Sequence, residues 1–246
     1  MVHTIKIGNF EYIKDDTNSY HRVLSNKERD TVFDYKQYIY IDGNFEDEDS
    51  LAKISNKELY IKFQNDVQKS NKSFEVLENW GLIPAHNSNI LDLGCGYGMF
   101  INQWITKGYG KGYGIDISPL VKRISPVSDN IQIIDLNSIC DIPISPNISL
   151  IIASDIIEHL FDVTHVLNVI SSKIKFGIQM FIEIPIISHN SDEIQLMSYK
   201  YLYPTRHLHL FTQQGIKQKL TKSGFQIIQS KLINDKYLIL VEKWKN

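Results

Sequence analysis

Three glycines, each separated by one residue, directly follow an apolar run in Asn89–Phe100, which reads NILDLGCGYGMF. Glycine lets the backbone turn sharply and leaves no side chain between a ligand and the main chain. The residues that follow have a helical pattern, and a helix start offers unpaired N–H groups to an anionic ligand group. Gly94, Gly96 and Gly98, with Asp92 before them, therefore predict a ligand-binding loop.

Two further carboxylates end the next two apolar runs, Asp116 in YGIDIS and Asp135 in IQIIDL. An acidic side chain about 20 residues after a glycine loop can accept both hydroxyls of a ribose. Asp135 is placed to meet an adenine edge. Any one of these aspartates could simply be a turn residue at the end of a strand. That interpretation is weaker when three such aspartates follow one another along the chain. We expect Cys95 to be a small buried apolar side chain and not a reactive thiol.

Groups that exchange protons near neutral pH lie in two later segments. Glu158 and His159 belong to DIIEHL, and His207 and His209 belong to RHLHLF. In an extended chain His207 and His209 would share a face. Such a pair can bind a metal, but no third ligand is evident in the sequence, so we predict no metal. A structural role remains the alternative interpretation for these histidines. For Glu158 the alternative is a carboxylate at a helix start, where the helix dipole stabilises it.

From Asn89 onward, apolar runs alternate with helical patterns, which is typical of a mostly parallel sheet covered on both faces. The last two runs are joined by Ile233–Lys236, too short for a parallel crossover, so they should be antiparallel. We predict an α/β, Rossmann-like fold whose seven-stranded sheet has one reversed strand. The expected strands are Ile90–Leu93, Gly112–Ile117, Ile131–Asp135, Leu150–Ser154, Ile178–Ile184, Phe225–Leu232 and Tyr237–Glu242, and the expected helices are Met99–Lys107, Pro119–Ile124, Phe161–Lys173 and Gln213–Ser223.

Residues 1–82 have a different pattern, and we predict that they form an N-terminal cap beside a ligand-binding domain over residues 83–246. The cap is either a lid that excludes water, or a helical appendage or dimer contact; the sequence does not separate these. Its expected elements are a hairpin of Thr4–Ile7 and Phe10–Ile13, helices over Ser25–Tyr38 and Ser55–Trp80, and an acidic loop over Gly43–Ser50.

LDLGCGYG, GIDIS, IIDLN and SDIIEHL, in this order and at this spacing, resemble the class I S-adenosylmethionine-dependent methyltransferases. The resemblance covers about Ile83 to the C-terminus. One departure is Ile148-Ser149, where many members have an aromatic–aspartate pair. The resemblance implies S-adenosylmethionine as cofactor, with the methionine part at the glycine loop, Asp92 near its amino end, and Asp116 at the ribose. It implies further cofactor contacts at Cys95, Ile117, Asp135, Leu136, Ser154 and Asp155.

Methyl transfer to a neutral hydroxyl also requires that the hydroxyl proton leaves. By resemblance, Glu158 and His159 line the acceptor pocket, where some small-molecule members also hold a metal. We predict His207, His159 and Glu158 as catalytic residues. The long connection over Pro185–Phe211 is typical of a lid or binding loop. The predicted acceptor-binding residues, from that connection and from the cap, are Tyr20, His21, Arg22, Tyr203, Arg206 and His209.

Composition limits the partners and the compartment. The formal charge of -2 and the mixed charges give no broad basic face, so nucleic acid is not expected. The apolar stretches are interrupted by acidic residues, the start has no signal-peptide pattern, and two cysteines form no disulfide framework. We predict a soluble cytoplasmic protein with a small-molecule acceptor and no membrane partner, and homo-oligomers remain open.

The favoured function is O-methylation of a small polar metabolite, with a sugar, nucleotide-linked sugar or phosphorylated precursor of a surface polysaccharide as the expected class. An N-methyltransferase is the nearest alternative, and a catalytically silent S-adenosylmethionine-binding module is a third. A nicotinamide oxidoreductase would need a glycine three residues after Gly96, where this chain has Met99.

Overall fold

The computed structural model describes residues 3–25, 29, 35–41, 44–83, 88–140, 144, 147–189 and 191–244. The chain divides into two compact units. The first unit comprises Met1–Phe33, Leu136–Ile144 and Ala153–Asn246, and the second comprises Asp34–Asp135 and Ser145–Ile152. The cap segment predicted over residues 1–82 is thus divided between them. Among the described residues, no helix combines the length and the apolar character that crossing a membrane requires.

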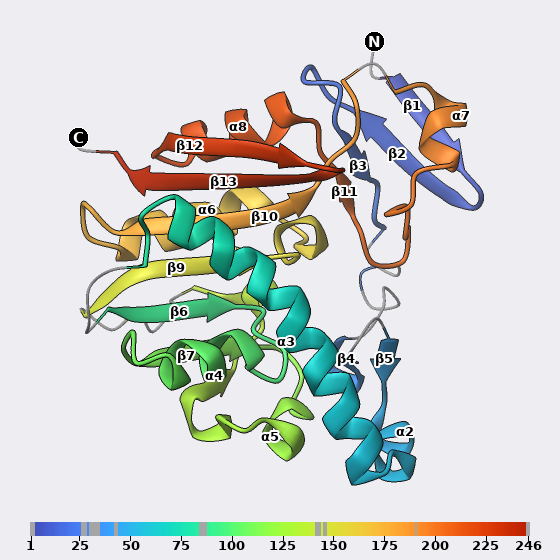
Figure 1. The fold of residues 1–246 in the computed structure, drawn as a ribbon. Coiled ribbons are helices and arrows are strands. Elements are labelled where there is room, and N and C mark those ends of the chain that lie inside the picture. Colours follow the sequence, from blue (N-terminus) through green and yellow to red (C-terminus); the bar gives the residue numbers. More distant parts are fainter. Residues whose placement is uncertain are drawn as a thin grey trace. The chain divides into compact units, whose positions relative to one another are not determined.

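The predicted seven-stranded sheet is confirmed, in the order β12-β13-β10-β9-β6-β7-β8. Figure 1 labels these strands except β8. The neighbours β6, β7, β8 and β9 pair in parallel. The reversed strand is β13, which pairs antiparallel with both β10 and β12, as the short connection before it predicted. The strands are β6 (Asn89–Leu93), β7 (Gly112–Asp116), β8 (Ile131–Ile133), β9 (Ile148–Ser154), β10 (Gln179–Pro185), β12 (Phe225–Ile233) and β13 (Lys236–Lys243).

The second unit packs its helices on apolar side chains. The helix predicted from Ser55 is α3 (Asn56–Asn79), and its capping box is present, because Ser55 and Glu58 each accept the other's backbone N–H. A buried cluster includes Ile101, Val121 and Ile131, with Phe63 packed against it. The other elements of this unit are η1 (Tyr35–Gln37), β4 (Ile39–Ile41), β5 (Asn44–Glu46), α2 (Glu48–Lys53), α4 (Met99–Thr106), α5 (Val121–Ile124) and η2 (Ser128–Asn130).

The first unit contains a second, four-stranded sheet in the order β1-β2-β3-β11. The predicted hairpin is confirmed, because β1 (His3–Ile7) and β2 (Phe10–Lys14) pair antiparallel around Gly8-Asn9. The strands β3 (Tyr20–Arg22) and β11 (His209–Leu210) were not predicted, and they join the hairpin to the long connection after β10. The other elements are η3 (Leu136–Ser138), η4 (Ile157–His159), α6 (Val163–Lys173), α7 (Glu193–Met197) and α8 (Gln213–Lys222).

Buried hydroxyls fix the N-terminal segment to the start of α8. The Thr212 backbone N–H donates to Ser19 Oγ at 3.0 Å, and the Thr212 hydroxyl donates to the Thr17 carbonyl at 2.7 Å. A Cβ on Gly215 would lie 1.9 Å from Ser19 Oγ, so only glycine fits there. The N-terminal segment is therefore packed into the first unit.

Two expectations for the N-terminal part differ from the structure. The acidic stretch predicted as a loop over Gly43–Ser50 instead contains β5 and the start of α2. The Asp47 carboxylate caps this helix by accepting the Ser50 N–H at 2.7 Å, and acidic residues in the first turn suit the helix dipole. Of the helix predicted over Ser25–Tyr38, residues 26–28 and 30–34 lie outside the described residues, and Tyr35–Gln37 form a 3-10 turn.

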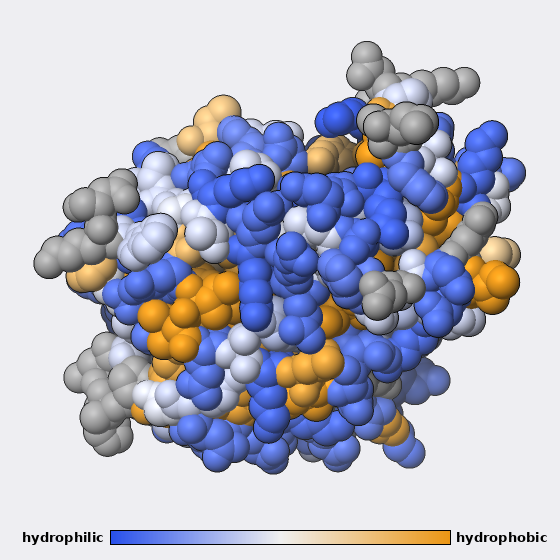
Figure 2. All heavy atoms as spheres, turned by 90° about the horizontal axis from the view of Figure 1, so that it is seen from above, coloured by the Kyte–Doolittle hydropathy of each residue, from blue (hydrophilic) through white to orange (hydrophobic). Residues whose placement is uncertain are grey.

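Hydrophobic residues on the face drawn in Figure 2 form separate patches among hydrophilic side chains. Such scattered exposure of the described residues is normal for a folded protein.

Candidate active site

The glycine loop adopts the sharp turn that its sequence predicted. Gly94, Gly96 and Gly98 all have positive φ, of 67°, 53° and 80°. The N–H groups of Gly94 and Cys95 donate to the Ile115 carbonyl, which holds the end of β6 against β7. Apart from its two chain neighbours, no described residue has an atom within 4 Å of the position that a Cβ would take on Gly96. The loop therefore presents bare main chain to open space, which fits a ligand that approaches the backbone.

Other glycines here serve packing. A Cβ on Gly98 would lie 2.7 Å from Val127 Cγ2, and a Cβ on Gly114 would lie 2.5 Å from Cys95 Sγ. The Cys95 side chain thus occupies the space that Gly114 leaves. Burial raises the pKa of the Cys95 thiol well above its usual value, so the thiol stays protonated. Cys95 has the chemistry expected of a small apolar side chain.

Asp116 holds the loop from the end of β7. Its Oδ2 accepts the Gly96 N–H at 2.8 Å, and its Oδ1 accepts the Ser118 N–H at 2.9 Å. Burial raises the pKa of this carboxyl, and these backbone donors oppose the shift. Each carboxylate oxygen keeps further acceptor capacity, which is what two ribose hydroxyls require.

Asp92 is 5% exposed at the inner end of the loop. Burial, with the nearby Asp116 charge, raises the pKa of Asp92 to about 8. A cationic ligand group beside it would restore the carboxylate form, as the amino group of a methionine moiety would do.

Asp135 and Ile117 are half-buried in the same unit. The Asp135 carboxylate lies 3.8 Å from the ammonium of Lys36, at the limit of an ion pair. Leu136 and Ser154 belong to the first unit, where Leu136 is buried in η3 and Ser154 is half-buried at the end of β9. Their predicted contacts with the cofactor stay predictions.

Asp155 follows β9 in a strained conformation, with φ of 50° on a residue that is not glycine. Its backbone N–H donates to the Glu183 carbonyl at 2.9 Å, and its carboxylate pairs with the Lys236 ammonium. Lys236 also lies 3.0 Å from the Glu183 carboxylate. Burial lowers the pKa of Lys236, but the two carboxylates outweigh it and raise that pKa. Lys236 therefore stays charged; it is not among the residues predicted from the sequence.

Glu158, His159 and His207 come together into one cluster, which we call the Glu-His-His cluster. One ligand-type atom from each residue lies within 4.8 Å of the other two. Glu158 is fully buried, and neither of its carboxyl oxygens has a hydrogen-bond partner among the described residues. The His159 and His207 rings are 4.7 Å apart in an edge-to-face contact. The structure thus brings together the three residues predicted as catalytic.

Main-chain hydrogen bonds hold the connection against η4. His159 Nδ1 lies 2.9 Å from the Arg206 carbonyl oxygen, and the Leu208 N–H donates to the Glu158 carbonyl at 2.8 Å. The His207 N–H donates to the Tyr203 carbonyl, which closes a turn. His207 is therefore not in an extended strand with His209, and the two rings have different neighbours. The shared face considered for them in the sequence does not form.

Burial sets the protonation of the cluster. It raises the pKa of Glu158 well above its usual value, and the Asp155 charge adds to that shift. It lowers the pKa of His159 to about 4 and that of His207 to about 3. Both imidazoles are therefore neutral near pH 7 and carry a free nitrogen lone pair.

His209 lies in a chain of hydrogen-bonding groups that crosses the four-stranded sheet. Its Nε2 lies 2.7 Å from the Leu160 carbonyl oxygen, and its Nδ1 lies 2.9 Å from His21 Nδ1. His21 Nε2 in turn lies 2.8 Å from an oxygen of Asp15. Because a carbonyl only accepts, His209 donates from Nε2 and accepts from His21 at Nδ1. These contacts fix both rings within the first unit.

The other predicted acceptor-binding residues also belong to the first unit. Arg22 donates to the Pro204 carbonyl at 2.6 Å and lies over the Phe10 ring. Tyr20 is 3% exposed, whereas Tyr203 is 47% exposed and contacts His207 edge-to-face. Of these residues, Tyr203 and the Arg206 main chain border the Glu-His-His cluster, and a role in acceptor binding stays a prediction for all of them.

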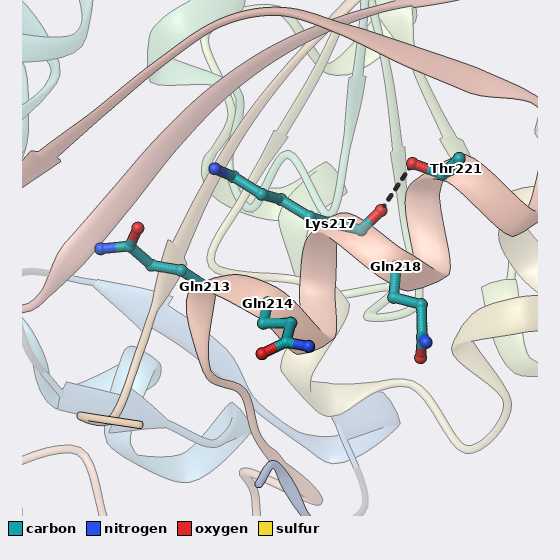
Figure 3. Close-up of a pocket in the computed structure, with 5 residues that line it drawn as sticks. All are labelled: Gln213, Gln214, Lys217, Gln218 and Thr221. Carbon is teal, nitrogen blue, oxygen red and sulfur yellow. Dashed lines mark hydrogen bonds between the residues drawn. The ribbon is translucent and has the colours of Figure 1, made fainter. Parts of the chain in front are cut away.

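A surface hollow on α8 is lined by none of these groups. Figure 3 shows its lining residues projecting from one helix in different directions, with one hydrogen bond of 3.0 Å from the Thr221 hydroxyl to the Lys217 carbonyl. Small-molecule sites need polar groups that converge. We therefore assign no function to this hollow, whose lining residues are Gln213, Gln214, Lys217, Gln218 and Thr221.

Comparison with known structures identifies the fold. A S-adenosylmethionine-dependent methyltransferase from Mesorhizobium loti is 16% identical, with a TM-score of 0.53 over 66% of this chain and 94% of that chain. One from Archaeoglobus fulgidus is 18% identical, with a TM-score of 0.53 over 77% of this chain and 100% of that chain. Magnesium protoporphyrin IX methyltransferase from Synechocystis PCC 6803, with bound SAH, is 14% identical, with a TM-score of 0.51 over 78% of this chain and 89% of that chain.

The sequence comparison identifies the family. No curated protein matches the chain. Residues 34–230, well over half of the chain, match the family model described as a methyltransferase domain. The chain therefore belongs to the methyltransferase domain family, and it is a S-adenosylmethionine-dependent methyltransferase with the class I fold that its motifs predicted.

Proposed function

We propose that the protein methylates an oxygen atom of a small polar metabolite, and that the Glu-His-His cluster acts on the hydroxyl that is methylated. The observation that carries this proposal is the convergence of Glu158, His159 and His207 after the end of β9. A nitrogen acceptor needs only a free lone pair, whereas a hydroxyl must lose a proton. A buried cluster of groups that can hold or bind protons is what oxygen chemistry requires.

The second unit supplies the cofactor seat in this proposal. The main chain at Gly94–Gly98 receives the methionine part, Asp92 faces its amino group, and Asp116 accepts the ribose hydroxyls. The open space at Gly96 and the fixed orientation of Asp116 support these roles. The remaining contacts proposed from the resemblance are at Cys95, Ile117, Asp135, Leu136, Ser154 and Asp155.

S-adenosylmethionine supplies a methyl group on a positively charged sulfur: the new C–O bond forms as the C–S bond breaks, and sulfur keeps the electron pair. The chain's own residues must align the acceptor and remove its proton. His207 and His159 are neutral imidazoles, so each has a nitrogen that can receive the hydroxyl proton. Glu158 lies 3.9 Å from His159 Nε2; its raised pKa keeps this carboxyl protonated in the resting cluster, so it would stabilise an imidazolium only after losing that proton.

For the acceptor class, we propose a sugar, a nucleotide-linked sugar or a phosphorylated precursor of a surface polysaccharide. Aromatic and basic side chains follow one another over residues 199–206. Tyr203 is exposed beside His207, and aromatic faces suit sugar rings. Arg206 would provide positive charge for a phosphate, whereas Lys200 is already paired with the Asp235 carboxylate at 2.9 Å.

The test measures formation of S-adenosylhomocysteine with a panel of sugars, nucleotide sugars, sugar phosphates and amines. We expect turnover with a hydroxyl acceptor. We expect His207→Ala to abolish turnover while S-adenosylhomocysteine still binds, and His189→Ala to leave it unchanged, because His189 is an exposed residue of the same connection. Turnover with amines alone, with only a modest loss in His207→Ala, would contradict oxygen transfer.

A further inference from the structure

The Glu-His-His cluster has the composition of a metal site. A carboxylate and two imidazoles form a common set for zinc and related divalent ions. The three ligand atoms lie within 4.8 Å of one another, whereas ligands of one tetrahedral zinc stand about 3.4 Å apart for bonds of about 2.1 Å. Metal binding would therefore require side-chain rotations that bring the three ligand atoms closer together.

Glu158 provides an independent observation. Its side chain is fully buried, and both carboxyl oxygens have no hydrogen-bond partner among the described residues. A buried carboxyl without partners is costly, which points to a missing ligand for it. The nearby cation Lys236 pairs with Asp155 and Glu183 instead. His159 Nε2, at 3.9 Å, is too far for a hydrogen bond to Glu158.

His159 is oriented as metal-binding histidines are. Its Nδ1 lies 2.9 Å from the Arg206 carbonyl, so Nδ1 carries the proton and Nε2 carries the lone pair. The Nε2 atom is the one that faces Glu158. A histidine ligand usually donates its other N–H to a carbonyl or carboxylate, which fixes its tautomer and ring orientation.

We propose that Glu158, His159 and His207 bind one divalent transition-metal ion of the zinc class. Three protein ligands leave a position open, which an acceptor oxygen can take. The metal site rests on the cluster itself, and its catalytic use rests on the proposed function. A metal-bound hydroxyl releases its proton more easily. With the ion bound, the lone pairs of His159 and His207 would be taken by the metal, so the acceptor proton would leave to water and not to either imidazole. The sequence predicted no metal, because His207 was paired with His209 and no third ligand was evident.

The test is metal uptake by the full chain after removal of metals with a chelator. The protein is dialysed against Zn²⁺ and its metal content is measured, and Co²⁺ is used to record visible spectra. We expect one Zn²⁺ per chain. Glu158→Gln and His207→Ala should each weaken Zn²⁺ binding about 10-fold or more, since even substitutions outside the ligand shell cause such losses. His189→Ala, outside the cluster, should bind Zn²⁺ as the wild type does.

Three results would overturn the metal site. They are no Zn²⁺ uptake by the wild type, equal uptake by Glu158→Gln and His207→Ala, or a thiolate-to-cobalt charge-transfer band, which would place the ion on a cysteine. Calorimetry with S-adenosylhomocysteine runs in parallel and confirms that each variant is folded. Failure of Zn²⁺ binding with intact nucleoside binding rejects the metal alone, whereas loss of nucleoside binding in the wild type rejects the proposed function.

Discussion

The backbone N–H of Gly96 donates a 2.8 Å hydrogen bond to Oδ2 of Asp116, 20 residues later in the chain. One carboxylate thus orders the glycine loop, and in the proposed function the same carboxylate accepts the ribose hydroxyls. A side chain with both tasks needs no rearrangement when the ligand arrives, so little of the binding energy is lost to ordering the site.

The open main chain at Gly96 gives the first prediction. Gly96→Ala adds a methyl group where nothing lies within 4 Å, at a φ of +53°. We expect the affinity for S-adenosylhomocysteine to fall about 10-fold or more, as one occupied contact of about 1.4 kcal/mol would imply. Gly108→Ala is the matched control, because Gly108 also has positive φ, of +74°, and open space, but lies outside the loop. Calorimetry measures both affinities. If Gly96→Ala and Gly108→Ala lost equal affinity, the cause would be backbone strain at positive φ and not a lost contact between Gly96 and the ligand.

Asp92 predicts a pH dependence of stability. Its pKa is raised to about 8 by burial and by Asp116, against about 3.9 in an unfolded chain. The folded state therefore holds the extra proton, so this contribution to stability is complete below about pH 4 and is lost as the pH rises through about 8. Asp92→Asn cannot ionise, and its stability relative to wild type should rise by roughly 3 kcal/mol between about pH 5 and pH 8. Urea unfolding at both pH values measures the free energy of unfolding of the two proteins. If the difference between them were the same at pH 5 and pH 8, the raised pKa of Asp92 would be disproved.

The contact between His21 and His209 predicts energetic coupling. Their Nδ1 atoms lie 2.9 Å apart, and both rings continue into Asp15 and Leu160. Removing either ring leaves the other with an unpaired nitrogen, so the double variant should lose less stability than the sum of the single variants. We expect a coupling free energy of about 0.5–3 kcal/mol in a double-mutant cycle of His21→Ala and His209→Ala. In a control cycle, His165→Ala replaces His21→Ala. The stability losses of His165→Ala and His209→Ala should be additive, because the His165 ring bonds to the Ile139 carbonyl instead.

The sequence predicted the main sheet and the sharp turn of the glycine loop because their signals are local. Apolar runs, glycine spacing and a four-residue connection identify β6, β7 and the reversed β13 without knowledge of distant partners. The three-residue β3 and the two-residue β11 have no such pattern, and they exist only because they pair with each other and with β2. The Glu-His-His cluster depends on the same kind of pairing, because the turn at Tyr203 brings His207 to His159. The alternating sequence pattern suggested His209 as the neighbour of His207. It could not show that a turn brings His207 to His159.

Calorimetric titration of S-adenosylhomocysteine into the wild-type protein tests the central claim most directly. We predict saturable binding of one nucleoside per chain, weakened about 10- to 100-fold in Asp116→Asn, since hydrogen bonds to a charged group contribute about 1.5–3 kcal/mol. Asp129→Asn, an exposed carboxylate in the same unit, should bind as the wild type does. Folded protein that releases no heat with either S-adenosylhomocysteine or S-adenosylmethionine, or that binds them equally well without the Asp116 carboxylate, would contradict the cofactor seat.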